Sequence, residues 1–196
     1  MKIAISLIIL TYLSLACFGQ EWKTHKTNDD MKVTYYRDTE NKMFYINIEQ
    51  TTKHTPTELI DNIKDVENYN QWVSNCTGAK ILEKFGKDSL YYYTRNEPPF
   101  PLSKKDAIFL VKINYAKDGS IKVYNKSTPS KLPLTDGWER VGHYIVEWEF
   151  IPNEENTTVK YKIETVYPAH TPEFALNQFI EKGPVHSVNK FLEKLD

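Results

Sequence analysis

Apolar and polar residues alternate along most of the middle of the chain, which is the pattern of β-strands with one buried face and one solvated face. In 141–150, for example, Tyr144 and Trp148 take one face while Glu147 and Glu149 take the other. The same pattern predicts strands at 31–37, 43–50, 79–85, 89–96, 107–115, 120–127, 141–150 and 159–167.

The spacing of apolar residues changes to three and four positions over 55–73, which predicts a helix or two short ones. Thr55 is followed three residues later by Glu58, and this is the spacing of a capping box. Pro56 suits the first helical position, where its missing N–H costs nothing. We therefore expect the helical segment to begin directly after Thr55.

A second helical pattern covers 171–195, near the end of the chain. Its apolar positions are Leu176, Phe179, Ile180, Val188, Phe191, Leu192 and Leu195. Gly183 and Pro184 interrupt this pattern, and a proline inside a helix removes a backbone donor and clashes with the preceding turn. We expect a kink there, or two helices placed end to end.

The elements follow the order two strands, a helix, about six strands and a long helix. Strands that are gathered together, with helices apart from them, indicate an α+β fold built on an antiparallel sheet. The helix at 171–195 is apolar along one side and needs a large apolar partner surface. We therefore expect a curved sheet with this helix lying across its concave face.

Composition limits the classes of partner. The 196 residues suffice for one domain with a sizeable core. The formal net charge is −1, so there is no electrostatic case for binding nucleic acid, and we expect none as a partner. The chain contains 13 tyrosines, which suit a cavity for an amphipathic ligand and are equally common in any half-exposed sheet.

The first 19 residues have the pattern of a secretory signal peptide: a basic start, an apolar run and then small residues. Cleavage after Gly19 leaves a mature domain at 20–196, which we expect to be secreted or periplasmic. Cys17 offers a second interpretation as the lipid-bearing cysteine of a lipoprotein. That interpretation is less favoured because Ser14 stands where a large aliphatic residue is preferred. Without the leader, Cys76 is the only cysteine, and we expect it to be buried.

The common motifs of catalytic and cofactor sites are missing from the sequence. It contains no GxGxxG, phosphate loop, HExxH, CxxC or GxSxG pattern, and its five histidines are scattered singly. We therefore expect no catalytic residues, no metal site and no cofactor, and a protein that is not an enzyme.

The most informative stretch is 91–109, where a strand ends, a proline-rich corner follows and a new strand begins at Asp106. The corner, Pro99-Phe100-Pro101 followed by Ser103 and Lys105-Asp106, resembles that of the START family of lipid-transfer domains. The resemblance extends from Trp22 to Leu195 and includes Tyr69, Trp72, Phe174, Asn177 and Gly183-Pro184. The chain departs from the family at Lys105, where arginine is common, and the two are not equivalent at a bidentate site.

The resemblance implies a helix-grip fold with a tunnel for one lipid or sterol, bound for transport or sensing and left chemically unchanged. It also leads us to expect a monomer that makes transient contact with membranes. The candidate lining residues are Tyr93, Arg95, Val111, Tyr144, Trp148, Leu176, Phe179 and Ile180. Arg95 is the candidate to hold the ligand's polar head; alternatively it lies at the outer edge and pairs with a surface carboxylate. Asp106 is expected to play a structural part at the corner.

Two other functions remain open. One is an enzyme of the same superfamily fold, such as a polyketide cyclase, which needs acid–base residues facing the cavity. The other is a protein-interaction module whose interior is filled by large aromatic side chains. The fold by itself does not choose among the three.

Overall fold

The structure is a computed structural model that describes residues 21–25, 31–99, 103–168 and 170–196. The predicted signal peptide at 1–19 lies outside the described residues, as do Phe100 and Pro101 of the proline-rich corner.

The described strands form one ten-stranded sheet in the order β1-β2-β3-β10-β9-β7-β6-β5-β4, with β8 attached to β6. All pairs along this path are antiparallel, and only β8 runs parallel to its partner. The strands are β1 (Lys23–His25), β2 (Met31–Asp38), β3 (Met43–Thr52), β4 (Cys76–Lys84), β5 (Ser89–Asn96), β6 (Lys105–Tyr115), β7 (Ile121–Ser127), β8 (Glu139–Arg140), β9 (Tyr144–Pro152) and β10 (Thr157–Val166).

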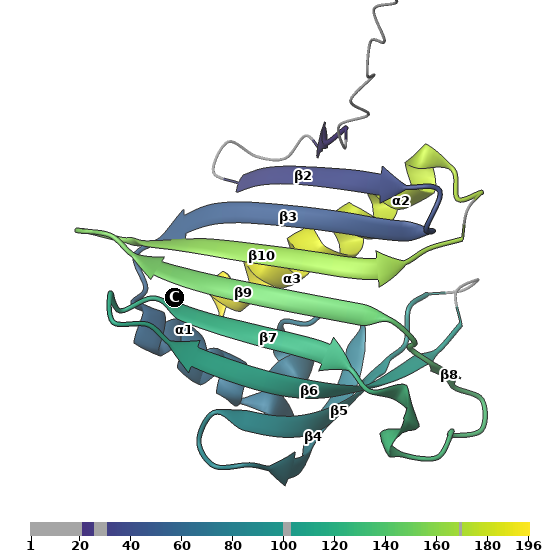
Figure 1. The fold of residues 1–196 in the computed structure, drawn as a ribbon, viewed down its shortest axis with the longest axis horizontal. Helices are drawn as coiled ribbons and strands as arrows, with labels where there is room; N and C mark the ends of the chain where they lie inside the picture. The colour runs from purple at the N-terminus through teal and green to yellow at the C-terminus, as the bar shows by residue number, and fades with distance from the viewer. Residues whose placement is uncertain (1–20, 26–30, 100–102, 169) are drawn as a thin grey trace, which may run out of the picture.

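Five helical segments lie behind the curved sheet in Figure 1, and the long C-terminal helix crosses its concave side. They are α1 (Pro56–Lys64), the 3₁₀ helix η1 (Val66–Gln71), α2 (Glu173–Ile180), the π-helical turn η3 (Glu181–Val185) and α3 (His186–Glu193). The short 3₁₀ helix η2 (Pro129–Lys131) lies in the loop between β7 and β8. We call the helix-bearing side the inner face and the opposite side the outer face. This arrangement confirms the predicted α+β helix-grip fold.

The first helical segment begins as predicted. The Thr55 hydroxyl accepts from the Glu58 backbone N–H at 3.3 Å, and the Thr55 backbone N–H donates to Glu58 Oε2 at 2.7 Å. These two bonds satisfy donors that a helix start leaves without partners. The helix then divides into α1 and η1, so the alternative of two short helices is the correct one.

The C-terminal helix passes Pro184 without breaking, because one π-helical turn absorbs the proline. The Ser187 hydroxyl donates to the Gly183 carbonyl at 2.8 Å, and the Ser74 hydroxyl donates to the Lys182 carbonyl at 2.5 Å. The Ser74 backbone N–H donates in turn to the Ser187 hydroxyl at 3.0 Å. Ser74, after η1, thus satisfies one carbonyl of the irregular turn and ties the C-terminal helix to the rest of the fold.

Two predicted strand starts, those of β4 and β9, were wrong by three residues. β4 begins at Cys76 instead of 79, and irregular register at Cys76/Gly78 and Ile81/Glu83 explains why its alternation is poor. β9 begins at Tyr144, and the short strand β8 before it was not predicted. Cys76 is buried, as expected. None of the helices in the described part of the chain is both long and apolar enough to cross a membrane.

Candidate functional site

The inner face of the sheet, opposite α2 and α3, is the candidate site because it is the apolar surface that the C-terminal helix covers. An aromatic cluster fills the part nearest α3. Phe191 of α3 lies 4.7 Å from Trp148 and 5.1 Å from Trp72, measured between ring centroids, and Trp148 lies 4.3 Å from Tyr161. Phe150 is also fully buried there. This part of the interior is packed with rings.

The inner face is less completely covered beside this cluster. Tyr144 and Val146 of β9 point inward and pack against the core, yet both remain partly exposed. Their partners on neighbouring strands are buried, including Ile163 beside Val146 and Thr165 beside Tyr144. Solvent therefore reaches the inner face at these two residues, and we call this place the accessible part of the inner face.

Polar groups surround this accessible part. Asn125 of β7 is buried beside Val146; its side-chain N–H donates to the Val146 carbonyl at 3.1 Å, and its Oδ1 accepts from the Tyr92 hydroxyl at 3.5 Å. The Ser127 hydroxyl donates to the Gly142 carbonyl and accepts from the Tyr144 backbone N–H at 2.9 Å. Within the described residues, the hydroxyls of Tyr144 and Tyr161 make no hydrogen bond.

The inner tyrosines are held in their neutral form. Burial raises the pKa of Tyr92, Tyr144 and Tyr161 above its usual value, because the phenolate would lose its water. Tyr144 adds a smaller electrostatic contribution to the raised pKa of both Tyr92 and Tyr161. The three hydroxyls are hydrogen-bond donors at neutral pH and poor proton acceptors.

Tyr93 and Arg95 do not lie on the inner face, so their predicted place in the tunnel was wrong. In β5 the inward positions are Leu90 and Tyr92, and Tyr93 and Arg95 point to the outer face. The run of three tyrosines at 91–93 offers no alternation, so the sequence could not set the direction of this strand. The alternative of an outer position for Arg95 is the correct one.

On the outer face Arg95 belongs to a cation–aromatic cluster. Its Nε donates to the Tyr93 hydroxyl at 3.2 Å, and its guanidinium lies 5.1 Å from the centre of the Trp138 ring. Lys104 lies 5.6 Å from the centre of the same ring. Trp138 thus packs at the sheet edge between two cations.

Asp106 anchors this corner through an ion pair with Arg140 of β8. Arg140 Nε lies 2.6 Å from Asp106 Oδ1, and Arg140 Nη2 lies 3.0 Å from Oδ2. The remaining Arg140 donors bind the carbonyls of Pro129, Leu132 and Pro133 at 2.7–3.1 Å. The hydrogen bonds from Arg140 hold the pKa of Asp106 below its usual value. Asp106 is therefore structural, as expected, and its bidentate partner is Arg140, which the sequence did not reveal.

The predicted lining residues divide into two groups. Val111, Tyr144, Trp148, Leu176 and Ile180 lie in the interior or pack against it. Phe179 is 41% exposed on the flank of α2, 6.3 Å from the Phe44 ring, so it does not line the interior as predicted. The helix turns by about 100° per residue, and Leu176 and Ile180 take the buried side. That any of these residues contacts a ligand stays a prediction.

Three inner residues were missed: Tyr92, Asn125 and Tyr161. Tyr161 shares the parity of the well-alternating run 159–167, and Asn125 is the polar member of the inward series Ile121, Val123 and Asn125. A polar residue at an inward position was the available signal.

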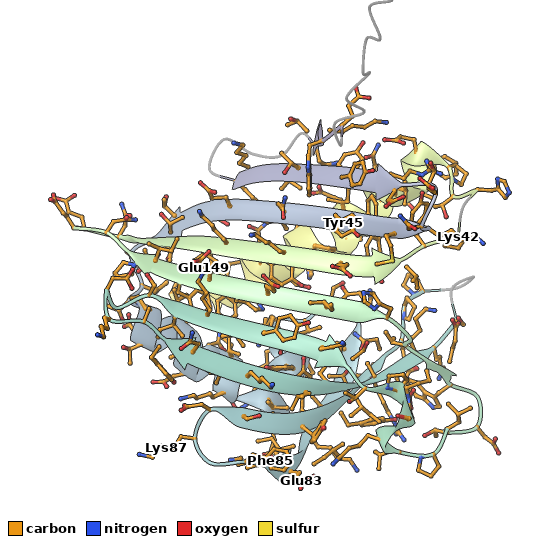
Figure 2. All side chains as sticks on the ribbon, in the orientation of Figure 1. Lys42, Tyr45, Glu83, Phe85, Lys87 and Glu149 are labelled. Atoms are coloured by element: carbon orange, nitrogen blue, oxygen red, sulfur yellow. The ribbon has the colours of Figure 1, made fainter. Side chains whose placement is uncertain are left out.

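Two shallow hollows, of about 310 and 240 Å³, lie on the outer face within the described part of the chain. Charged residues line both, and Lys122 pairs with Glu149 at 2.8 Å in the larger one. Figure 2 shows Glu149 among the side chains of this solvated face. Because they open away from the helices, these hollows are not the expected tunnel.

A curved antiparallel sheet that holds a C-terminal helix, with an apolar interior between them, defines a helix-grip protein. A sequence model of the START domain matches residues 12–196, and the chain belongs to the START domain family. Membership supports binding of a hydrophobic ligand at the level of the family.

Several known proteins are similar. The chain is 25% identical to the uncharacterized protein PA1579 of Pseudomonas aeruginosa, over 91% of this chain and 92% of that one. Its fold matches a STAR-related lipid transfer protein from Xanthomonas axonopodis with a TM-score of 0.79 and 21% identity, over 89% of this chain and 98% of that chain. Human StAR-related lipid transfer protein 5 matches with a TM-score of 0.76 and 17% identity, over 89% and 86%. The Zhui aromatase/cyclase from Streptomyces sp. R1128 matches with a TM-score of 0.55 and 18% identity, over 78% and 93%.

Proposed function

We propose that this protein binds one lipid, sterol or similar hydrophobic molecule between the inner face of the sheet and the C-terminal helix. The observation that carries the proposal is the partial exposure of Tyr144 and Val146 on the inner face of β9, beside buried partners on β10. Apolar ligand surface placed there leaves water, at a gain of about 25 cal/mol per Å². The similar fold of the bacterial and human lipid transfer proteins supports the same ligand class.

The protein carries or senses its ligand and leaves it unchanged. A catalytic role, as in the aromatase/cyclase with a related fold, requires a base near the reacting atom. Asp106 is the only buried carboxylate among the described residues, and it is paired with Arg140 on the outer face. The inner tyrosines have raised pKa values, so their hydroxyls stay protonated at neutral pH and cannot act as the base. These features favour binding without chemistry.

The place of action is part of the proposal. The basic start, apolar run and small residues at 1–19 support export, with the mature domain acting outside the cytoplasm as a monomer. Loading and release of an apolar ligand require transient contact with a membrane. Lipid attachment at Cys17 is the less favoured alternative.

Native mass spectrometry of the mature protein, purified from the organism that makes it, tests the proposal. We expect one hydrophobic molecule per chain, which organic extraction and lipid analysis then identify. A protein that carries nothing, and that also ignores a panel of fluorescent lipids and sterols, would favour the filled-core interaction module. The cluster around Trp148 and Phe191 is the feature that supports that alternative.

A further inference from the structure

Three tyrosines on different strands share the inner face beside its accessible part: Tyr92 of β5, Tyr144 of β9 and Tyr161 of β10. Tyr92 and Tyr144 both contact the Phe109 ring, and Tyr161 contacts the Trp148 ring. Phe109 lies 5.2 Å from Tyr92 and 6.0 Å from Tyr144, and Trp148 lies 4.3 Å from Tyr161. Along β9, Tyr144 lies two residues before Val146 and Trp148 lies two residues after it. Tyr144 therefore borders the accessible part of the inner face directly, and Tyr161 lies next to Trp148 on the other side.

Several hydrogen-bond donors in this region have no acceptor. Tyr161 is only 7% exposed, and within the described residues its hydroxyl makes no hydrogen bond. The Tyr144 hydroxyl has none either, and the buried indole N–H of Trp72, whose ring lies 6.0 Å from that of Trp148, is also without a partner. The bond from Tyr92 to Asn125 is long, at 3.5 Å. The indole N–H of Trp72 is buried without an acceptor, which is costly. The hydroxyls of Tyr144 and Tyr161 have no protein partner among the described residues and can donate to an oxygen that a ligand brings.

The same region offers no positive charge to an anion. Among the described residues, Asp106 and His54 are the only buried ones of the types Asp, Glu, Lys, Arg and His. Asp106 lies on the outer face with Arg140, and His54 pairs with the C-terminal Asp196. A carboxylate or phosphate placed among the tyrosines would lose its water and meet no cation.

We infer that the ligand presents an uncharged, hydrogen-bond-accepting oxygen, such as a hydroxyl, an ester or a ketone, to Tyr144 and Tyr161. This inference rests on the proposed function, since it assigns the polar end of the same interior ligand. The apolar remainder then lies along the inner face near Val146 and Leu176. The tyrosines act as specificity determinants and hold a neutral head in place by donated hydrogen bonds.

Matched sixteen-carbon probes test the inference. Mature protein is titrated at pH 7.4 with 1-hexadecanol, methyl palmitate and palmitate, and binding is measured by native mass spectrometry. We expect the two neutral probes to bind at least about tenfold more tightly than palmitate, because burying an unpaired charge is costly. Equal or tighter binding of palmitate would overturn the inference.

Isosteric variants locate the interaction. Tyr144→Phe and Tyr161→Phe each remove one hydroxyl while keeping the ring, and each should weaken binding of the neutral probes about threefold to tenfold. Tyr124→Phe is the matched control, because Tyr124 lies on the outer face among the residues of the larger hollow. Circular dichroism checks that every variant is folded. Unchanged affinity in the doubly substituted protein would refute the assignment of these tyrosines.

A separate variant distinguishes this inference from the proposed function. Val146→Trp fills the accessible part of the inner face and should abolish binding of all three probes, with Val146→Phe as a milder substitution if the first does not fold. If the wild-type protein binds no probe, or if the folded variant binds them undiminished, the interior site itself is wrong. If the variant abolishes binding while the tyrosine substitutions change nothing, the interior site stands and the neutral-head assignment fails.

Discussion

The ion pair between Asp106 and Arg140 allows a sharp test of how the outer corner is held. Asp106 is 1% exposed, and the Arg140 side chain is 5% exposed. Asp106→Asn keeps the size of the side chain but removes the charge that balances the guanidinium. Breaking a buried pair from one side typically costs about 3–5 kcal/mol, because the remaining charge stays buried and uncompensated.

Three backbone carbonyls continue to accept from Arg140 in this variant, so we expect the lower part of that range, about 3 kcal/mol. For a domain of this size the loss corresponds to a fall in Tm of roughly 6–12 °C. Urea unfolding followed by circular dichroism measures the change. Glu139→Gln is the control, since Glu139 pairs with Lys105 at the exposed surface and should contribute less than about 1 kcal/mol.

The pH dependence of the same group has a definite sign. The folded-state pKa of Asp106 is lowered, so its stabilising contribution is present above the usual carboxyl pKa and is lost as the pH falls through the folded value. The wild-type protein should therefore lose more stability than Asp106→Asn on acidification below about pH 4. Free energies of unfolding for Asp106→Asn and wild type that agree within about 0.5 kcal/mol at pH 7 would refute the reasoning. Ligand binding should survive in the variant, because the pair lies on the outer face.

Three further predictions concern the core, the first helix and the tyrosines. Phe191→Ala should lower the free energy of unfolding by about 3–5 kcal/mol, because Phe191 is fully buried against Trp148 and Trp72; an effect below about 1 kcal/mol in urea unfolding would contradict the packing. Thr55→Ala should cost about 1 kcal/mol through loss of the cap, and a neutral result in the same assay would count against it. Because burial raises the folded-state pKa of Tyr92 and Tyr161, stability should be complete below the usual tyrosine pKa and decline above about pH 10; absorbance at alkaline pH should show these phenols ionising only as the protein unfolds.

The sequence by itself determined the class of fold. Alternating residues in β9 and β10, the helical stripe at 171–195 and the capping box at Thr55 are local patterns, and each carries its own physical reason. They were sufficient for the order of the elements and for the inner position of Tyr144 and Trp148. The proline-rich corner and its flanking residues were sufficient for the family.

The tertiary structure alone decided which way β5 faces and what holds the corner. Three successive tyrosines at 91–93 have no alternation, so only the packing of Tyr92 against Tyr69 and Phe109 shows which ring is inside. Arg140 reaches Asp106 across 34 residues of sequence, and no local pattern predicts such a pairing. That Tyr92, Tyr144 and Tyr161 share the inner face likewise depends on the order of strands in the sheet, because contacts between strands far apart in the chain are set by the global fold.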